Sequence, residues 1–342
     1  MALAGTDDGA IATGTTPVLY PVLIALCAFG FVTSLVTGPA AISPLDALTA
    51  LFTDSGGPET DIMRDIRLPR AVLGAMVGAS LGLTGAAMQG LLRNPLAEPG
   101  LIGVSSFAAL GAVISLQTGL AATLTLALPL SALAGAGLSV GLLVLLAGPR
   151  GSSLTLILAG IAISALGGAL TTLVLNLSPN PFAASEIVFW MMGSLADRSW
   201  THVFLAFPLM AIGWVALFAT SRGLDALTLG EDAAAALGIR MGRLRALVVA
   251  GTAAAIGAAT AVTGAVGFVG LVVPHVLRQF VGGAPGRLLP ASALGGAAMV
   301  LLADSAVELI LPDRDLKLGV LTALVGAPVF LHLVYRTRRA GL

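Results

Sequence analysis

Runs of about 20 consecutive apolar residues recur along this chain, and they constrain its fold more than any other feature. A helix needs roughly 20 residues to cross a bilayer, because each residue adds about 1.5 Å of rise. The runs are continuous and lack the alternation that membrane β-strands require. Only 10% of the residues are charged, and mean hydropathy is +1.00. The sequence therefore predicts an all-α polytopic membrane protein.

We expect about ten transmembrane helices, some of them short enough to be tilted or broken. They form a single membrane domain over residues 17–335, between an N-terminal tail (1–16) and a C-terminal tail (336–342). The N-terminal tail has two Asp and no Lys or Arg, unlike a signal peptide, so the first span should be an uncleaved anchor. The expected spans are 17–37, 69–92, 100–117, 122–147, 153–175, 202–220, 244–263, 266–280, 288–310 and 318–335.

The distribution of basic residues predicts the orientation. An even number of spans places both termini on one side, and basic residues concentrate in cytoplasmic loops. The side that holds the termini would carry 11 basic residues and the other side 6, which together make the 17 in the chain. Both termini are therefore expected in the cytoplasm. The six residues expected outside are Arg64, Arg67, Arg70, Arg198, Arg314 and Lys317.

Enzyme chemistry finds little support in the sequence. There is no G-x-x-x-x-G-K-[ST] phosphate loop, so a nucleotide-hydrolysing module of that type is not recognisable. His202, His275 and His332 lack metal-ligand spacing, and Cys27 is the only cysteine. We predict no catalytic residue, no metal site and no cofactor.

Four acidic residues, Glu98, Glu186, Asp304 and Glu308, leave an ion-coupled transporter open as an alternative, although Glu98 falls in the stiff inner loop and Glu186 lies near the outer surface. Asp304 and Glu308 are four residues apart and so share one helix face near the end of a predicted span. Buried acids often serve ion coupling in secondary transporters. An interfacial acidic pair is the simpler interpretation, and it favours transport that is powered by a separate protein.

Two segments resemble each other and suggest an inverted repeat. "RLPRAVLGAMVGASLGLTGA" (67–86) and "GRLRALVVAGTAAAIGAATA" (242–261) open the second and seventh predicted spans. Elements five spans apart run in opposite directions, as in transporters with inverted repeats. The alternative is a chance likeness between two helices that are rich in Ala and Gly and begin with Arg.

A stiff polar segment, "RNPLAEPG" (93–100), interrupts two apolar runs. Pro95 and Pro99 lack an N–H group and fix φ, so a helix cannot continue through them. Asn94 can bond its own backbone and end the preceding helix. We expect a tight reversal at the inner mouth of a pore, followed by a span in which Ser105 and Ser106 face the pathway. A simple turn between helices is the alternative.

From residue 60 onward the chain resembles the FecCD family, the permeases of bacterial importers for iron–siderophores, haem and vitamin B12. The first matching stretch is "RLPRAVLGAMVGASLGLTGAAMQGLLRNPLAEPGLIGVSSFAALGA" (67–112). Later ones are "WMMGSLADRSW" (190–200), "LGEDAAAALGIRMGRLR" (229–245), "GAVGFVGLVVPHVLR" (264–278), "GRLLPASALGGAAMVLLAD" (286–304) and "GVLTALVGAPVFLHLV" (319–334). The resemblance implies an inverted-repeat, type II permease of an ATP-powered (ABC) importer in the cytoplasmic (inner) membrane. It further implies partnership with a second copy, a cytoplasmic ATPase dimer and a soluble binding protein outside.

The resemblance also implies roles for particular residues. Residues 222–243 would form the coupling segment that docks into the ATPase, for which an ordinary amphipathic connector is the alternative. Arg67 and Arg70 would meet acidic residues of the binding protein, for which interfacial snorkelling is the alternative. The family usually has an Arg where this chain has Glu308, so one docking charge is lost or reversed, and Arg314 could replace it. The gating helix would include Trp190, Met191, Met192 and Gly193, for which an aromatic belt anchor is the alternative. The coupling contacts would come from Gly230, Glu231, Asp232, Ala234, Ala235, Leu237 and Gly238.

The cargo is the least determined feature. An iron chelate (siderophore) or haem is the main expectation, vitamin B12 is the alternative within the class, and an ion-coupled transporter is a more distant one.

Overall fold

The computed structural model describes residues 11–40, 42–53, 57–148, 153–178, 181–310 and 316–339, and these residues form helices with no strand among them. Seven helices are long and apolar enough to cross a membrane, and three shorter apolar helices accompany them. The seven candidate spans fall on α1 (Ile11–Val36), α4 (Leu68–Leu92), α7 (Ala127–Ala147), α8 (Ser153–Asn176), α10 (Trp200–Phe218), α13 (Met241–Thr263) and α15 (Pro285–Ile310). The span on α4 begins before that helix, at Pro58. The shorter ones are α5 (Val104–Gln117), α14 (Val269–Arg278) and the apolar stretch Leu318–His332 of α16 (Leu318–Arg339).

Each of the ten predicted spans corresponds to one of these helices, so the expected fold class is confirmed. The boundaries agree to within a few residues, except that α1 begins at Ile11, well before residue 17. Some spans were expected to be short and therefore tilted or broken, and the structure shortens the helices of spans 100–117 and 266–280. Their helices are α5 and α14, the latter extended by the 3-10 turn η3 (Gln279–Val281).

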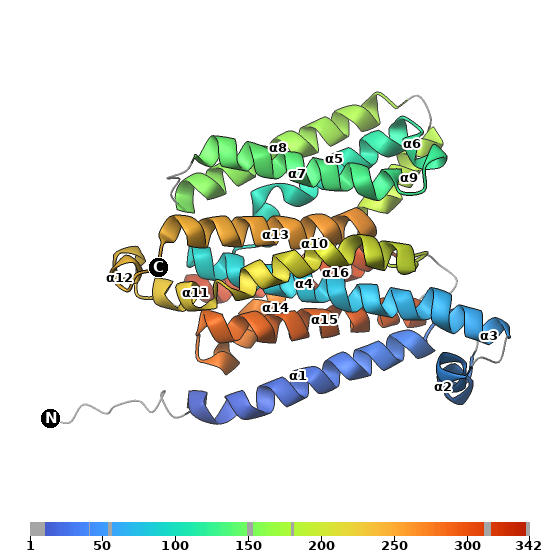
Figure 1. The fold of residues 1–342 in the computed structure, drawn as a ribbon, viewed down its shortest axis with the longest axis horizontal. Helices are drawn as coiled ribbons and strands as arrows, with labels where there is room; N and C mark the ends of the chain where they lie inside the picture. Colours follow the sequence, from blue (N-terminus) through green and yellow to red (C-terminus); the bar gives the residue numbers. More distant parts are fainter. Residues whose placement is uncertain are drawn as a thin grey trace.

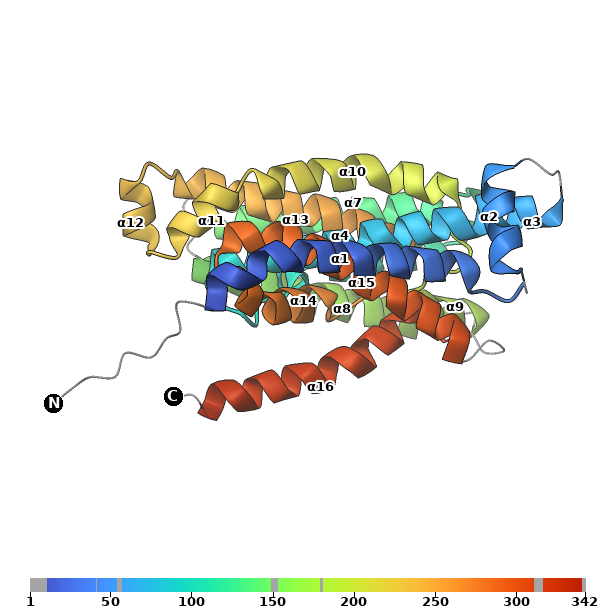
Figure 2. The ribbon, with the colours of Figure 1, turned by 90° about the horizontal axis from the view of Figure 1, so that it is seen from below.

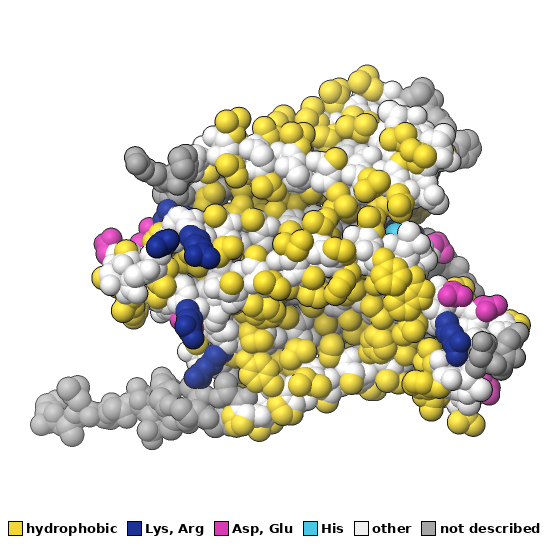
Figure 3. All heavy atoms as spheres, viewed as in Figure 1, with side chains coloured by type: hydrophobic (Ala, Val, Ile, Leu, Met, Phe, Trp, Pro, Cys, Tyr) yellow, Lys and Arg dark blue, Asp and Glu magenta, His cyan; other side chains and the backbone are white. Residues whose placement is uncertain are grey.

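Short helices lie at the two ends of the bundle (Figure 1). One end, here the α3 end, carries α2 (Pro44–Phe52), α3 (Pro58–Asp61), the π-helical turn η1 (Ile62–Arg67), α6 (Leu120–Thr123) and α9 (Pro181–Met191). The other, the α12 end, carries α11 (Ser221–Leu227) and α12 (Glu231–Ala236), and there α1 begins and α16 ends (Figure 2). Charged side chains gather at both ends, and the face between them is largely hydrophobic (Figure 3).

The helices α4 and α13 form the centre of the bundle. The apolar window of the span that contains α4 is 83% buried and that of α13 is 78% buried, against 22% for α1. Small residues make this possible, because they let helix backbones approach closely. A Cβ on Gly82 would overlap the carbonyl oxygen of Ser292, and one on Gly78 would overlap that of Gly296. The helices α4 and α15 are thus packed backbone against backbone.

The suspected repeat segments fall on these two central helices. Segment 67–86 opens α4, which runs toward the α12 end, and segment 242–261 lies in α13, which runs away from it (Figure 1). A short non-helical or 3-10 stretch and then a half-length helix follow each of them: α4 leads to α5, and α13 leads to α14. The opposite directions and the shared pattern agree with an inverted repeat.

Candidate transport pathway and partner-facing surfaces

The chain reverses directly after α4, as the sequence predicts. The amide N–H of Leu96 donates to Asn94 Oδ1 at 2.9 Å, and the amide of Asn94 donates to the carbonyl of Gln89 at 3.1 Å. Arg93 takes up the left-handed conformation that ends the helix, with φ of 49°. The expectation that Asn94 bonds its own backbone here is confirmed, and Pro95 follows at once in the turn.

The rest of this segment does not stay at the helix ends, which corrects the expectation of a reversal confined to the pore mouth. Residues 98–103 return to the middle of the bundle, which we call half-depth. The hydroxyl of Ser164, at the midpoint of α8, donates to the carbonyl of Gly100 at 3.4 Å. Pro99 starts the 3-10 turn η2 (Pro99–Ile102), and Gly103, with φ of 77°, leads into α5. Only Asn94 and Pro95 therefore lie at the reversal, and Pro99 lies at half-depth.

A second interruption between helices, from α13 to α14, meets the first one, from α4 to α5, at half-depth. After α13 residues 264–267 have no regular secondary structure, and Phe268 starts α14 in the left-handed conformation, with φ of 66°. A Cβ on Gly270 would lie 2.8 Å from Pro99 and 2.9 Å from the carbonyl oxygen of Leu81, at the middle of α4. The backbone N–H of Phe268 donates to Glu98 Oε1 at 3.3 Å. One hydrogen bond thus joins the two interruptions.

A cavity of about 450 Å³ lies where these interruptions meet. Its polar wall includes Glu98, Ser105, Ser106 and Ser164, so the structure brings both predicted pathway serines to one cavity. The sequence interpretation placed Glu98 in a loop at the pore mouth and missed it here. The remaining lining residues are Leu81, Pro99, Gly100, Ile161, Ile256, Ala265, Val266, Gly267 and Gly270.

A second cavity, of about 550 Å³, borders the predicted gating helix. Met191 and Met192 line it, together with residues of α16 and with Ala265, which also lines the first cavity. The two cavities are therefore neighbours along one track that leads from the α3 end to half-depth. The helix α9 ends at Met191, and the left-handed Gly193 follows it, with φ of 73°.

Glycines hold the predicted gating segment against the core. The amide of Gly319 donates to the carbonyl of Gly193 at 3.3 Å, and that of Ser194 donates to the carbonyl of Thr263 at 2.8 Å. A Cβ on Gly264 would overlap the carbonyl oxygen of Trp190. Trp190 is half-buried against the core, which is unlike an exposed anchor in an aromatic belt.

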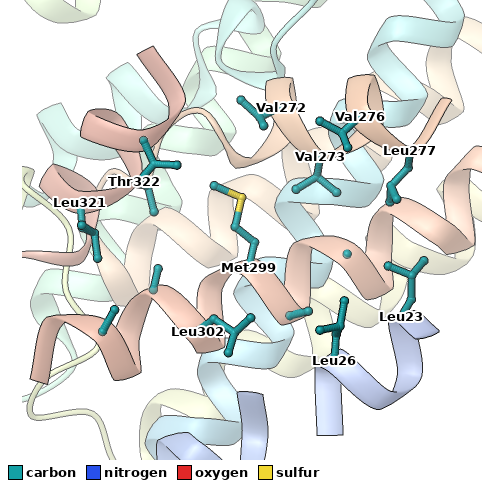
Figure 4. Close-up of a pocket in the computed structure, with 15 residues that line it drawn as sticks. Leu23, Leu26, Val272, Val273, Val276, Leu277, Met299, Leu302, Leu321 and Thr322 are labelled. Atoms are coloured by element: carbon teal, nitrogen blue, oxygen red, sulfur yellow. The ribbon is translucent and has the colours of Figure 1, made fainter. Parts of the chain in front are cut away.

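A third cavity, of about 540 Å³, lies between α1, α14, α15 and α16 and is almost wholly apolar. Figure 4 shows leucine, valine and methionine side chains pointing into it, among them Leu26, Val273 and Met299. Its one hydroxyl, on Thr322, already donates to the carbonyl of Gly319 at 3.1 Å. This cavity has no polar group to receive a polar cargo, so it is not part of the track.

The predicted coupling segment projects from the α12 end (Figure 1). Gly230 and Gly238, with φ of 104° and 85°, flank α12, and its first turn carries Glu231 and Asp232, as expected for a helix N-terminus. Glu231 pairs with Arg245 of α13 at 2.7 Å, which ties the segment to the core.

The structure separates the alanines of the coupling segment. Ala234 is fully buried, whereas Ala235 is exposed. Leu229 and Leu237 are 68% and 64% exposed, and they form an apolar rim on the projecting surface. This pattern distinguishes the side of the segment that packs inward from the side that a partner can reach.

Arg67 is buried, whereas its expected docking role requires an exposed side chain, so that expectation of exposure is wrong. Its side chain is 4% exposed, and its guanidinium donates to the carbonyls of Leu35 and Val36 at 2.9 Å each and to that of Ala40. These carbonyls lie at and after the C-terminus of α1, where a cation is favoured by the unpaired C=O groups and the helix dipole. The sequence interpretation missed this capping role because nothing near Arg67 in the chain signals it.

Arg70 also has internal partners. It binds Asp304 through two bonds of 2.8 and 2.9 Å and also contacts Glu308, and its side chain is 17% exposed. The predicted shared face of the two acids is confirmed, but the acids are the ion-pair partners of Arg70 rather than a free pair. Arg314, the proposed substitute for a docking charge, lies outside the described residues.

The fold and the track define the class of protein: a polytopic helical membrane protein with inverted, broken helices, which is the architecture of a transport subunit. Residues 26–336 match the FecCD transport family, so the chain belongs to this family and is a permease of ABC importers.

Individual relatives agree over nearly the whole chain. The chain is 38% identical over 326 residues to the vitamin B12 import system permease protein BtuC of Salmonella paratyphi A, covering 94% of this chain and 93% of that one. It is 36% identical over 330 residues to the probable siderophore transport system permease protein YfhA of Bacillus subtilis, covering 94% and 96%. A solved structure, described as a candidate metal-chelate type ABC transporter in an inward-facing conformation, superposes with a TM-score of 0.81 at 34% identity, covering 94% and 99%.

Proposed function

We propose that this permease conducts an iron chelate (siderophore) or haem across the cytoplasmic membrane, driven by ATP hydrolysis on a separate ATPase subunit. The observation that carries this is the track of two neighbouring cavities, which leads from the gating helix to a polar chamber between two broken helices. Such interruptions at half-depth are where membrane transporters place their pathways. Membership of the FecCD family supports the cargo class.

A second copy of the chain would complete the pathway. The helix α16 stands away from the rest of the bundle (Figure 2), and it exposes Leu324, Val325 and Leu331 at 65%, 52% and 68%. The same helix borders the cavity of the gating segment. Packing of α16 against a partner would bury these side chains and enclose the track along the dimer axis.

The projecting segment 222–243 would couple the permease to the ATPase dimer. Its inward side is fixed by buried Ala234 and by the Glu231–Arg245 pair, so movement of the ATPase would reach α13 directly. The exposed surface around Ala235, Leu229 and Leu237 would enter a groove on the ATPase. In this arrangement the α12 end and both tails, 1–16 and 336–342, face the cytoplasm, in agreement with the excess of basic residues there.

The binding protein would then dock at the α3 end. Arg70, one of the two arginines expected to dock, is paired with Asp304 and Glu308. The exposed acids Asp46, Glu59, Asp61 and Asp65 surround this end. The docking surface of this permease is therefore less basic than the pair of arginines implies.

Vitamin B12 is the second candidate cargo, favoured by the 38% identity to permeases that carry that name. The deciding experiment reconstitutes the permease with its ATPase and binding protein in liposomes. Uptake of a ferric siderophore, haem and cyanocobalamin is then measured with and without ATP. ATP-dependent uptake of an iron chelate or haem is expected. Uptake that ceases when an ionophore dissipates ion gradients at constant ATP would instead identify an ion-coupled transporter.

A further inference from the structure

Glu98 differs from the other acids within the membrane-spanning part of the described chain. Asp304 and Glu308 both pair with Arg70. Glu98 has no basic partner among the described residues, and one backbone N–H, that of Phe268, is its hydrogen-bond donor. It also lies at half-depth beside Pro99 and Gly100, too far from either end for its carboxylate to reach an interface. An unpaired carboxylate in hydrocarbon is costly, so it must face water or a polar ligand.

The cavity supplies that polar surrounding. Glu98 lines it together with Ser105, Ser106 and Ser164 and with the non-helical residues 265–267. The N-terminus of α14 lies directly behind the carboxylate, because Phe268 caps that helix and donates to Oε1. A helix N-terminus favours an anion, and this contact holds the Glu98 carboxylate in place.

We propose that Glu98 contacts the cargo in transit, and that its carboxylate accepts hydrogen bonds from N–H or O–H groups of the cargo or pairs with a cationic group. The chamber is rich in acceptors and carries one negative charge, so it favours donors and cations and disfavours exposed anionic groups. This inference rests on the proposed transport function and adds to it the polarity of the cargo surface that passes half-depth.

The first test measures the charge of the chamber without requiring transport. In a Cys27→Ser background, Ser105→Cys places a thiol in the cavity, and the rates of modification by cationic and anionic methanethiosulfonate reagents are compared. The cationic reagent should react at least about threefold faster, and Glu98→Gln should abolish the preference. A control thiol at Ala108, which is fully buried on the same helix, should stay unmodified. Equal rates for both reagents, or a preference that survives Glu98→Gln, overturn the proposal.

The second test measures transport in the reconstituted complex with two probes, a ferric trihydroxamate chelate and cyanocobalamin. Glu98→Gln keeps a side-chain oxygen that can accept from the Phe268 N–H. The hydrogen bond between the two interrupted segments is therefore preserved while the negative charge is lost. Uptake per ATP hydrolysed should fall about tenfold for the transported probe, the loss expected when a hydrogen bond to a charged group is removed. Unchanged uptake per ATP overturns the proposal. If the unmodified complex transports neither of these probes nor haem, the assigned cargo class fails, whereas the thiol-modification result still decides the charge of the chamber.

Discussion

Replacement of Arg67 by Met should destabilise the protein rather than weaken docking. The side chain is buried, and its guanidinium serves three carbonyls at the end of α1. Gly38, whose φ is 150°, leaves room for this group, since a Cβ there would lie 3.1 Å from Arg67 Nη2. Methionine fills part of the volume but donates no hydrogen bond.

The size of the destabilisation follows from the carbonyl groups that the substitution leaves without a hydrogen-bond donor. The Leu35 carbonyl is buried at the bond to Arg67, and those of Val36 and Ala40 are part-buried. A buried acceptor without a donor costs about 1–3 kcal/mol, and part-buried ones regain some water. The loss of a cation at a helix C-terminus adds about 0.3–1 kcal/mol. Together these contributions predict a loss of about 2–5 kcal/mol in the free energy of unfolding.

Reversible denaturant unfolding of the purified permease in detergent measures this loss. Arg64→Met is the matched control, because the Arg64 side chain makes one hydrogen bond among the described residues, from Nε to the carbonyl of Ala50 at 3.1 Å, and its loss should cost less than about 1 kcal/mol. Binding-protein affinity of the folded Arg67→Met fraction should stay within about twofold of the unmodified protein. Unchanged stability together with weakened, salt-dependent binding would refute the capping role and restore the docking one.

Three further predictions concern the coupling segment, the core and the orientation. Ala235→Trp should abolish co-purification of the ATPase while Ala235→Ser should not, because overpacking of a fitted contact costs about 1–3 kcal/mol. Gly82→Ala should lower thermal stability, since its Cβ would overlap a carbonyl of α15, whereas Gly141→Ala, which has open space around it, should not. A cysteine at Asp61 should react with an impermeant thiol reagent added to whole cells, and one at Leu229 should react only after permeabilisation.

Each of these has a contrary outcome. Full ATPase capture by the Trp variant would make α12 a simple connector. Equal thermal stability of the Gly82→Ala and Gly141→Ala variants would mean that α4 and α15 can move apart at little cost. The reverse labelling pattern would place the α12 end outside the cell.

Much of this fold could be predicted from local patterns. Apolar runs of the right length specify the spanning helices, because a backbone in lipid must satisfy its own hydrogen bonds within each helix. Pro95 and Asn94 mark the end of α4 because their restrictions act within a few residues. The weak likeness of 67–86 to 242–261 indicated an inverted repeat, and the two segments lie on the two central helices, which both need small residues where backbones touch.

Other features were decided only by tertiary packing. The sequence shows that Arg67 and Arg70 are basic, but their partners are 27 to 32 and 234 to 238 residues away in the chain. The bond between Glu98 and Phe268 spans 170 residues, and no local signal distinguishes a proline-rich turn at the pore mouth from one that returns to half-depth. Periodicity likewise could not tell which side of the alanine run in α12 faces inward. Composition and spacing determine which helices can form, because those forces act between neighbours in the chain. The depth of a carboxylate and the partner of an arginine depend on which helices pack together, and this is a property of the assembled bundle.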